Sequence, residues 1–546
     1  MKREQLGSRL GFIMLSAGCA IGCGNVWKFP WMCGQNGGGS FMLIYLLCLV
    51  ILGIPALVLE FSIGRAAQTS PLFMYRKLEK PGQKWGIFGW FCLLGNIALM
   101  AFYTVVCGWI IYYFVQFLRG KNGSLGFSAM ISSPSVNVFF LLVTVVIAFF
   151  ILSFNLQGGL ERVTKYMMSA LLVLMLALAV HSLFLKGSGE GMTFYLKPDF
   201  SKIDGSVIVG AMNQAFFTLS TGMGGMAIFG SYIGKEHSLM GEAIHVITLD
   251  TLVAFLAGVI IFPACFTFDL EVNAGPSLLF DTMAAVFNNM SGGRIWGSLF
   301  FLFMVFAAMS TVLGVCENIL AMIRELTGWS RPKGSVVCGT GVFLLALTTA
   351  LGFSVFHFQP FAEGTTWLDF WDFIVSNNIL PLGSLILALF CCNKFGWGWD
   401  NFIKESNTGK GLKVQKWIQI FDAAFCSNRN MFFVYDAVVI GIFGNTADTV
   451  SAHGTLGTVK IIHIHLAVCD FGWLDQDQSV GTDTKVTVTD ISGYCGRIFH
   501  SFLKTVYIYV IISNTMHFCK FHQKSLLIWL NIYTPLVSYR KNVMKK

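Results

Sequence analysis

Charged residues are scarce in this chain. Aspartate, glutamate, lysine and arginine make up 12% of its 546 residues, whereas apolar residues make up 55%. A soluble domain carries about 25% charged residues, so the composition excludes an ordinary soluble globular protein. The net charge of +9 does not indicate a nucleic-acid partner either, because the basic residues gather in short stretches between long apolar runs.

Recognisable catalytic chemistry is equally sparse. The sequence holds no glycine-rich phosphate-binding loop and no nucleophile–base set, which disfavours an ATP-driven pump and predicts that the protein is not an enzyme. Its 15 cysteines lie mostly within apolar runs and are interpreted as small buried apolar residues. Neither Cys391 with Cys392 nor Cys19 with Cys23 has the spacing of a metal site. The first apolar run continues past Gly39 without a small-residue cleavage site, so no removable signal peptide is predicted.

Long apolar runs dominate the sequence instead. A membrane-spanning helix needs about 20 consecutive apolar residues, and ten stretches meet that requirement. The chain is therefore predicted to be an all-α membrane protein that crosses the bilayer many times. The ten candidate spans are residues 10–35, 40–64, 86–118, 137–155, 166–186, 206–232, 242–266, 295–322, 335–353 and 367–392.

The distribution of lysine and arginine predicts the orientation. These residues precede the first span and follow the second, fourth, sixth, eighth and tenth, whereas the alternate loops hold fewer of them. The positive-inside rule then places the N-terminus in the cytoplasm, for a multi-pass protein of the plasma (inner) membrane. Five spans per half put the two halves in opposite orientations, so we expect an inverted five-plus-five helix repeat.

Two of the spans have poor helix-forming sequence at their centres. Glycine disfavours helix by about 1 kcal/mol relative to alanine, and glycines recur within Gly18–Gly24 and Thr218–Gly224. Unpaired backbone groups survive at membrane depth only where they line a cavity or bind a ligand. We therefore predict that the first and sixth helices are broken and that the breaks form a binding site.

The sequence changes character near residue 418. Residues 1–418 are predicted to form the transmembrane core of ten helices, and residues 419–546 a divergent tail of uncertain structure. Two apolar runs in the tail, 432–443 and 505–512, are short for a span. The tail is interpreted either as a loosely ordered appendage or as the product of a frameshift or gene fusion.

Ordered motifs run from about residue 3 to residue 417. They are Arg9-Leu10-Gly11-Phe12, Gly22-Cys23-Gly24-Asn25-Val26-Trp27-Lys28-Phe29-Pro30, Asn36-Gly37-Gly38-Gly39-Ser40-Phe41, Gly53-Ile54-Pro55 with Glu60 and Gly64-Arg65, Gln214-Ala215-Phe216-Phe217-Thr218-Leu219-Ser220, and Phe306-Ala307-Ala308-Met309-Ser310-Thr311. Together they resemble the neurotransmitter:sodium symporter family. The resemblance implies sodium-coupled import of a neutral L-amino acid with a hydrophobic or aromatic side chain by alternating access, by a monomer or weak dimer. Two alternatives are a symporter for another small zwitterion, and a non-transporting amino-acid sensor or inactive product that results from the aberrant tail.

The resemblance implies two sodium sites. A hard cation requires oxygen ligands, which unwound backbone, amides, hydroxyls and carboxylates supply. The alternative for the hydroxyls is a hydrogen bond back to their own helix. The implied ligands are Ala20, Asn25, Thr218 and Asp250 for the first ion, and Gly18, Ile21, Ala307, Ser310 and Thr311 for the second.

Asp250 is an ionisable residue inside a span, which is costly and normally functional. Its position resembles one at which chloride-dependent family members carry asparagine beside a bound chloride. We expect its carboxylate to supply that negative charge, so that transport does not require chloride. Tyr45 and Gln214 could still contribute to a residual anion site. The alternative is a carboxylate that only lines a water-filled cavity.

An amino-acid substrate is implied by partners for both of its charged ends. The outer half-helix begins near Cys23 and Gly24 and offers free N–H groups to a carboxylate, and Tyr103 resembles the carboxylate-binding tyrosine of the family. Without the family, these and the pocket residues would be ordinary membrane packing. The implied ammonium partners are the Ala20, Phe217 and Thr218 carbonyls and the Ser220 hydroxyl, and the implied side-chain pocket is lined by Leu99, Phe217, Met223, Thr311 and Val315.

Two gates are implied as well. The outer gate would pair Lys28 with Asp369, where lysine replaces the commoner arginine and loses its two-pronged geometry. The inner gate would pair Arg3 with Glu325, with Tyr232 nearby. Exposed ion pairs contribute less than about 1 kcal/mol, which suits a gate that must open.

Overall fold

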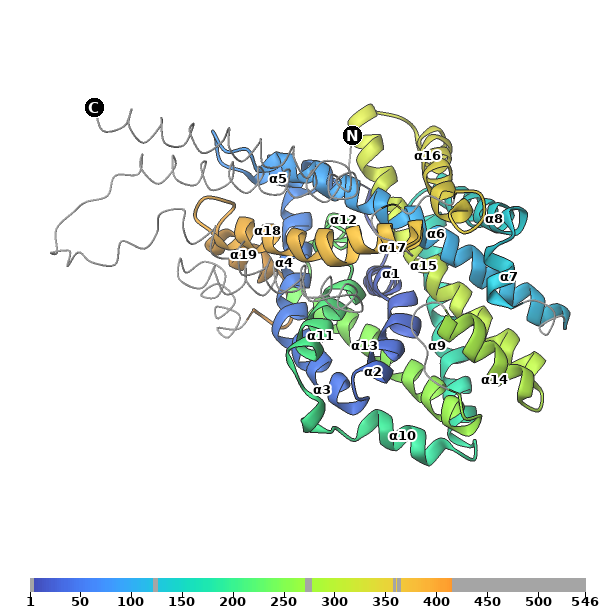
Figure 1. The fold of residues 1–546 in the computed structure, drawn as a ribbon. Coiled ribbons are helices and arrows are strands. Elements are labelled where there is room, and N and C mark those ends of the chain that lie inside the picture. The colour runs from blue at the N-terminus through green and yellow to red at the C-terminus, as the bar shows by residue number, and fades with distance from the viewer. Residues whose placement is uncertain (1–3, 121–125, 271–276, 357–359, 361–364, 415–546) are drawn as a thin grey trace, which may run out of the picture. The chain divides into compact units, whose positions relative to one another are not determined.

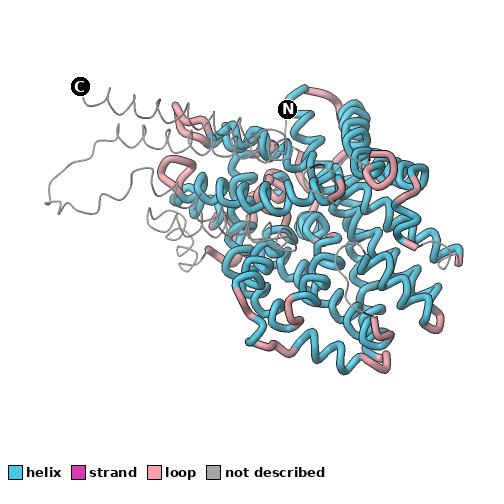
Figure 2. The backbone as a smooth tube through the Cα atoms, viewed as in Figure 1, coloured by secondary structure: helices cyan, strands magenta, loops and turns pink. Residues whose placement is uncertain are grey.

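The computed structural model describes residues 4–120, 126–270, 277–356, 360 and 365–414, and all of these except residues 360 and 365 belong to one compact unit. Within these ranges the secondary structure is helical without any strand, and one isolated bridge pairs His237 with Lys410 (Figure 2). The predicted all-α fold is confirmed. The predicted tail, with its two short apolar runs and its boundary at residue 418, lies outside the described residues.

Eight helices in the described part of the chain are long and apolar enough to cross a membrane, and a bent pair at the N-terminus would be a ninth. Together, the eight helices and the bent pair match nine of the ten predicted spans. The other predicted span, 206–232, is a helix, a run of turns and a short helix. The eight are α3, η2 and α4 (Gly39–Cys48, Leu49–Gly53, Ile54–Ala67), η3 and α6 (Trp85–Ile87, Phe88–Arg119), α8 (Pro134–Ser153), η4 and α9 (Gln157–Glu161, Arg162–Leu183), α13 (Leu239–Thr267), α15 (Gly293–Thr327), α16 (Arg331–Leu351), and α17, η7 and α18 (Trp367–Asp372, Phe373–Ile379, Leu380–Cys392).

Shorter helices lie between the spans and after the last described one. One of them begins at Pro71, since a proline at the first helical position gives up an N–H that has no helical partner anyway. The short helices are α5 (Pro71–Leu78), α7 (Phe127–Ile131), α10 (Ser188–Leu196), η5 (Phe200–Lys202), η6 (Leu278–Thr282), α14 (Met283–Asn289) and α19 (Trp399–Ser406).

The first predicted break lies at Ile21 and Gly22. Helix α1 (Arg9–Ala20) ends there, and Ile21 has an extended backbone with φ of −71° and ψ of 103°. The chain then continues as the π-helix η1 (Gly24–Lys28) and α2 (Phe29–Gln35), which are bent by 53° from α1. The break falls within the predicted glycine-rich stretch, so this prediction is confirmed.

The second break follows α11 (Gly205–Thr218). Residues 219–226 form turns, and a single short helix, α12 (Ala227–Gly230), resumes after them. Gly222 and Gly224 have φ of 102° and 73°, a region that residues with a side chain disfavour. The second predicted break is therefore confirmed too, and its glycines are required by the backbone.

Close backbone contacts fix α12 against α4. A Cβ atom at Gly64 would lie 1.9 Å from the Ala227 carbonyl oxygen, and one at Gly230 would lie 2.5 Å from the Phe61 carbonyl oxygen. Glycine at both positions lets the two backbones touch, as small residues do between membrane helices. Helix α1 packs against α9, α13 and α15 (Figure 1). The inverted relation between the two halves stays a prediction.

Candidate functional site

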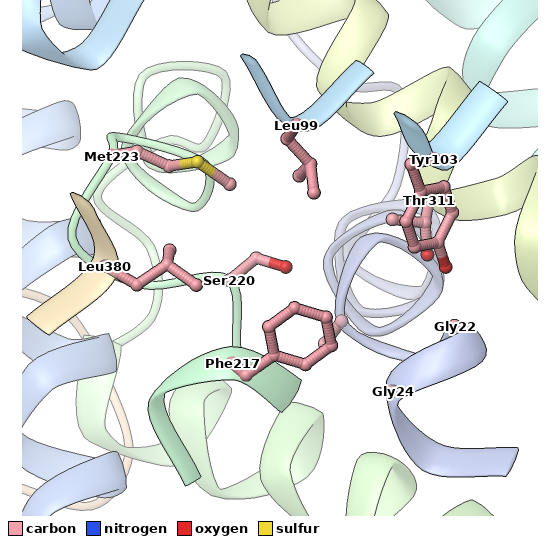
Figure 3. Close-up of a pocket in the computed structure, with 10 residues that line it drawn as sticks. Gly22, Gly24, Leu99, Tyr103, Phe217, Ser220, Met223, Thr311 and Leu380 are labelled. Atoms are coloured by element: carbon pink, nitrogen blue, oxygen red, sulfur yellow. The ribbon is translucent and has the colours of Figure 1, made fainter. Parts of the chain in front are cut away.

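A small cavity of about 20 Å³ lies beside the two breaks, with room for roughly one water molecule. Its walls come from the end of α1 and the break after it, from α6, from α11 and the turns that follow, and from α15 and α18 (Figure 3). A larger molecule can enter only if side chains move. The lining residues are Ala20, Gly22, Gly24, Leu99, Tyr103, Phe217, Ser220, Met223, Thr311 and Leu380.

Most of the predicted substrate residues meet at this cavity. Eight of the eleven line it, and the other three, Cys23, Thr218 and Val315, are buried without lining it. Sequence reasoning missed Gly22 and Leu380. A Cβ atom at Gly22 would lie only 2.2 Å from the nearby tyrosine hydroxyl oxygen, so any side chain there would fill the site.

The cavity has a polar side and an apolar side. Figure 3 shows Tyr103 and Thr311 on one side, and Met223 with Leu380 on the other. The Tyr103 hydroxyl accepts a hydrogen bond from the Cys23 amide at 2.8 Å. The hydroxyl and the start of the outer half-helix therefore lie together, which is the arrangement expected of a carboxylate site.

The first predicted sodium set gathers around the fully buried Asp250. Its carboxylate accepts hydrogen bonds from the Asn25 amide at 2.8 Å and from the Thr218 hydroxyl at 3.1 and 3.2 Å. No basic side chain pairs with this carboxylate among the described residues. A nearby cation stabilises an ionised carboxylate in a low-dielectric interior, and a hard cation prefers carboxylate and hydroxyl oxygens. The Asp250 and Thr218 oxygens therefore fit a sodium ion, whereas Asn25 Oδ1 accepts a hydrogen bond from the Gly22 amide at 3.0 Å and Ala20 is the last residue of α1.

The second predicted sodium set gathers around Thr311. Its hydroxyl oxygen lies 3.3 to 3.5 Å from three carbonyl oxygens, which belong to Gly18, Ile21 and Ala307. The Ser310 hydroxyl donates to the Ala307 carbonyl at 2.9 Å, so both hydroxyls also bond back to their own helix, as the alternative interpretation expects. The break after α1 thus brings two main-chain oxygens to the oxygens of α15.

Sequence reasoning missed the side chain that satisfies the turns after α11. Glu60 of α4 is fully buried and accepts hydrogen bonds from the amides of Gly222, Gly224 and Met226 at 2.6, 3.2 and 2.8 Å. Its carboxylate replaces the helical carbonyls that these amides lack. The available signal was an ionisable residue inside a predicted span.

Two buried side-chain amides, those of Asn96 and Asn318, also bind the turns after α11. Asn96 Nδ2 donates to the Met223 carbonyl at 2.8 Å. Asn318 Nδ2 donates to Asn96 Oδ1 at 2.9 Å and to the Gly224 carbonyl at 3.3 Å. The two side chains thereby hold the backbone of a cavity-lining residue.

The predicted outer pair has the wrong acidic partner. Lys28 Nζ lies 3.6 Å from Asp372 Oδ1 and donates to the Ser376 hydroxyl at 3.2 Å, and that hydroxyl donates to Asp372 Oδ1 at 2.5 Å. Asp369 instead accepts hydrogen bonds from Thr366 in a capping box at the start of α17. Because an acidic residue in the first turn is engaged by its own helix N-terminus, the carboxylate three residues later pairs with Lys28.

The predicted inner pair cannot be compared in full, since Arg3 lies outside the described residues. Glu325 accepts a hydrogen bond from the Ser70 amide at 2.6 Å. Tyr232 donates its hydroxyl to Glu317 at 2.7 Å, so it contacts a different acidic residue of α15.

A network of ion pairs joins the N-terminal segment to α15 and α16. Glu4 Oε1 lies 3.1 Å from Arg331 and 3.2 Å from Arg324, and Arg331 lies 2.7 Å from Glu317. Burial alone raises the pKa of Glu4, but hydrogen bonds from the two arginines outweigh burial and hold that pKa below its ordinary value. The network ties the first residues of the chain to two spans.

Tyr45 and Gln214, which were predicted for a residual anion site, are both fully buried. Gln214 Nε2 donates to the Gly24 carbonyl at 2.9 Å. The Tyr45 hydroxyl and Gln214 Oε1 have no hydrogen-bond partner in the described ranges. A buried hydroxyl donor of this kind is compatible with an anion site, which stays a prediction.

Comparison with known proteins gives concordant matches. The profile of the Sodium:neurotransmitter symporter family matches residues 3–123 and 121–446. An uncharacterized sodium-dependent transporter of Bacillus subtilis, YhdH, is 36% identical over 396 residues, which cover 71% of this chain and 87% of YhdH. An uncharacterized sodium-dependent transporter of Haemophilus influenzae is 33% identical over 462 residues, which cover 81% of this chain and 98% of the relative. The crystal structure of MhsT in complex with L-phenylalanine matches with a TM-score of 0.72 at 34% identity, over 80% of this chain and 100% of MhsT.

Proposed function

The chain belongs to the sodium:neurotransmitter symporter family, which consists of sodium-dependent transporters and not of enzymes, and we propose that it imports a neutral L-amino acid with a hydrophobic or aromatic side chain by sodium-coupled symport. It is a multi-pass membrane protein. The proposal includes a plasma (inner) membrane location with the N-terminus in the cytoplasm, which the lysine and arginine distribution supports.

The two-sided cavity is the observation that carries the proposal. The Tyr103 hydroxyl lines its polar side and accepts a hydrogen bond from the Cys23 amide, which does not itself line the cavity; a hydroxyl next to a helix N-terminus suits a substrate carboxylate. Leu99, Met223 and Leu380 contribute apolar side chains, which suit an apolar substrate side chain. An amino acid exceeds the present volume of about 20 Å³, and the unbranched Met223 side chain can adapt to it. The solved complex of MhsT with L-phenylalanine supports this substrate class.

Two sodium ions are co-transported in this proposal. The groups around Asp250 would bind one ion and the oxygens around Thr311 the other. A unit charge that moves through 100 mV releases about 2.3 kcal/mol, so two ions can drive substantial accumulation of substrate. Asp250 supplies a fixed negative charge next to the first ion, which removes the need for chloride.

Alternating access requires that one route to the cavity is closed while the other is open. We assign the Lys28–Asp372 pair to the outer route and the network of Glu4 and Arg331 to the inner route. Lys28 and Asp372 are partly exposed, so their ion pair is weak. The inner network is more buried, since Arg331 is 7% and Glu317 0% exposed, so the inner route should be the costlier one to open.

Uptake into proteoliposomes tests the proposal. We expect L-phenylalanine or L-leucine to accumulate only with an inward sodium gradient, and a competition screen of the twenty amino acids to single out neutral apolar ones. Sodium-dependent binding without accumulation would assign a sensor instead. If the only competitor is a zwitterion that is not an amino acid, the protein is a symporter for that small zwitterion instead.

A further inference from the structure

A second cavity lies at the N-terminal end of α9, away from the substrate site. It has a volume of about 250 Å³, which holds several water molecules. Among the described residues its walls come from the N-terminal segment, from η4 and from the first turns of α9. The lining residues are Gly7, Gln157, Glu161, Arg162, Lys165 and Tyr166.

The cavity lining has a net formal charge of +1, because it holds Arg162, Lys165 and one carboxylate. Arg162 is exposed and Lys165 is half-buried, and neither forms an ion pair or a side-chain hydrogen bond with any described residue. The carboxylate that lines the cavity, Glu161, is already engaged: it accepts hydrogen bonds from the Gly7 amide at 2.8 Å and the Ser8 hydroxyl at 2.9 Å. Two cations therefore remain available to an anion.

The cavity continues into a membrane-facing apolar surface. Tyr166, Val173, Leu176 and Val180 are 64%, 67%, 53% and 54% exposed, and their spacing places them on one face of α9. Such a face in a membrane-spanning helix contacts acyl chains. The positive cavity thus lies where the headgroup of a lipid on this face would be.

We propose that this cavity binds the headgroup of an anionic phospholipid, with the phosphate between Arg162 and Lys165 and an acyl chain along the exposed face of α9. Basic pockets at the cytoplasmic ends of membrane helices recognise anionic headgroups. Free inorganic phosphate would share the headgroup chemistry but would gain nothing from the apolar face. The lipid also lies next to Gly7, beside the segment that carries the inner network.

Lipid retention by the purified full chain tests the proposal. Native mass spectrometry would compare the binding of phosphatidylglycerol and phosphatidylcholine to the wild type and to the double variant R162Q/K165Q. We expect the wild type to prefer phosphatidylglycerol, and the double variant to lose roughly 30-fold in affinity for it, since two basic residues near an anionic headgroup account for such a factor. The matched control is R76Q/K77Q, which removes two exposed cations at the end of α5, outside the cavity, and should bind phosphatidylglycerol normally.

Three results would overturn the proposal: unchanged lipid binding by R162Q/K165Q, an equal loss in R76Q/K77Q, and displacement of the lipid by excess inorganic phosphate, which would assign a small-anion site. Thermal unfolding of each variant verifies that it is folded. Because the measurement needs neither sodium nor amino acid, its failure would leave the proposed transport function standing, and a failure of transport would leave this result standing.

Discussion

The ammonium nitrogen of Lys28 lies 4.1 Å from the centre of the Phe217 ring. The same lysine pairs with Asp372, and Phe217 lines the central cavity. A cation–π contact and an ion pair therefore converge on one side chain next to the proposed substrate site, and opening of the outer route must disrupt both.

The outer pair predicts a specific effect on substrate release. The variant D372N should speed dissociation of bound amino acid by up to about fivefold, since a partly exposed ion pair contributes about 1 kcal/mol or less. D369N is the matched control, because Asp369 caps α17; it should lower stability by about 1 kcal/mol without a change in release. Dissociation of radiolabelled substrate measures both, and equal acceleration by D369N would contradict the assignment.

Tyr103 should bind the substrate carboxylate. The variant Y103F should weaken sodium-dependent substrate binding by roughly 10- to 150-fold, because a hydrogen bond to a charged group is worth about 1.5–3 kcal/mol. Y113F removes a buried hydroxyl from the same helix that has no hydrogen-bond partner in the described residues, so it should bind normally. Binding isotherms measure the two variants, and a normal isotherm for Y103F would rule out this role.

Asp250 should make transport independent of chloride. Uptake by the wild type should be unchanged when gluconate replaces chloride, because the buried carboxylate supplies the negative charge beside the proposed sodium ion. The variant D250N should lose uptake in gluconate and regain part of it in chloride. A collapse of wild-type uptake in gluconate would reject the idea.

Met223 should control the size of the accepted side chain. M223A enlarges the apolar side of the cavity and should shift the preference toward tryptophan over alanine by roughly tenfold. M223F narrows the cavity and should shift the preference toward alanine. The reason is that one methylene of pocket volume changes substrate discrimination by about 1–3 kcal/mol. Met226 is equally buried but does not line the cavity, so M226A should leave the ratio unchanged. Inhibition constants from competition uptake measure it; an unaltered ratio in both Met223 variants would show that another side chain sets the size limit.

The ion pairs of Glu4 should stabilise the folded protein except at strongly acidic pH. Its pKa in the folded protein is lowered, so its contribution is fully present above the unfolded-state pKa of about 4.3 and is lost as the pH falls through the lower folded-state pKa. Relative to E4Q, the wild type should therefore show a constant excess thermal stability between about pH 5 and 8, and the excess should shrink below about pH 4. An excess that grows on acidification would contradict the ion-pair network.

The sequence predicts the broken helices and much of the site because both depend on local chemistry. Glycine clusters at Gly22 and Gly222 weaken helix where they stand. Polar residues such as Asp250 and Thr311 are rare within apolar spans, so they mark a functional surface before any contact is known. These signals need no knowledge of which helix lies beside which.

The parts of the site that the sequence does not predict depend on tertiary contacts, which no local sequence pattern contains. Leu380 reaches the cavity only because α18 packs beside the turns after α11, and Glu60 is far in sequence from the amides that it satisfies. The choice between Asp369 and Asp372 depends on the capping box at the start of α17, which engages Asp369.

The contact between Gly64 and Ala227 has a mechanical consequence. Main-chain atoms of the two helices are in direct contact there. Side-chain rotation therefore cannot absorb a displacement between α4 and α12. The two helices are therefore expected to shift together during a transport cycle. Glu60 of α4 also binds the amides of Gly222, Gly224 and Met226, so the turns at residues 219–226 should follow the same rigid unit.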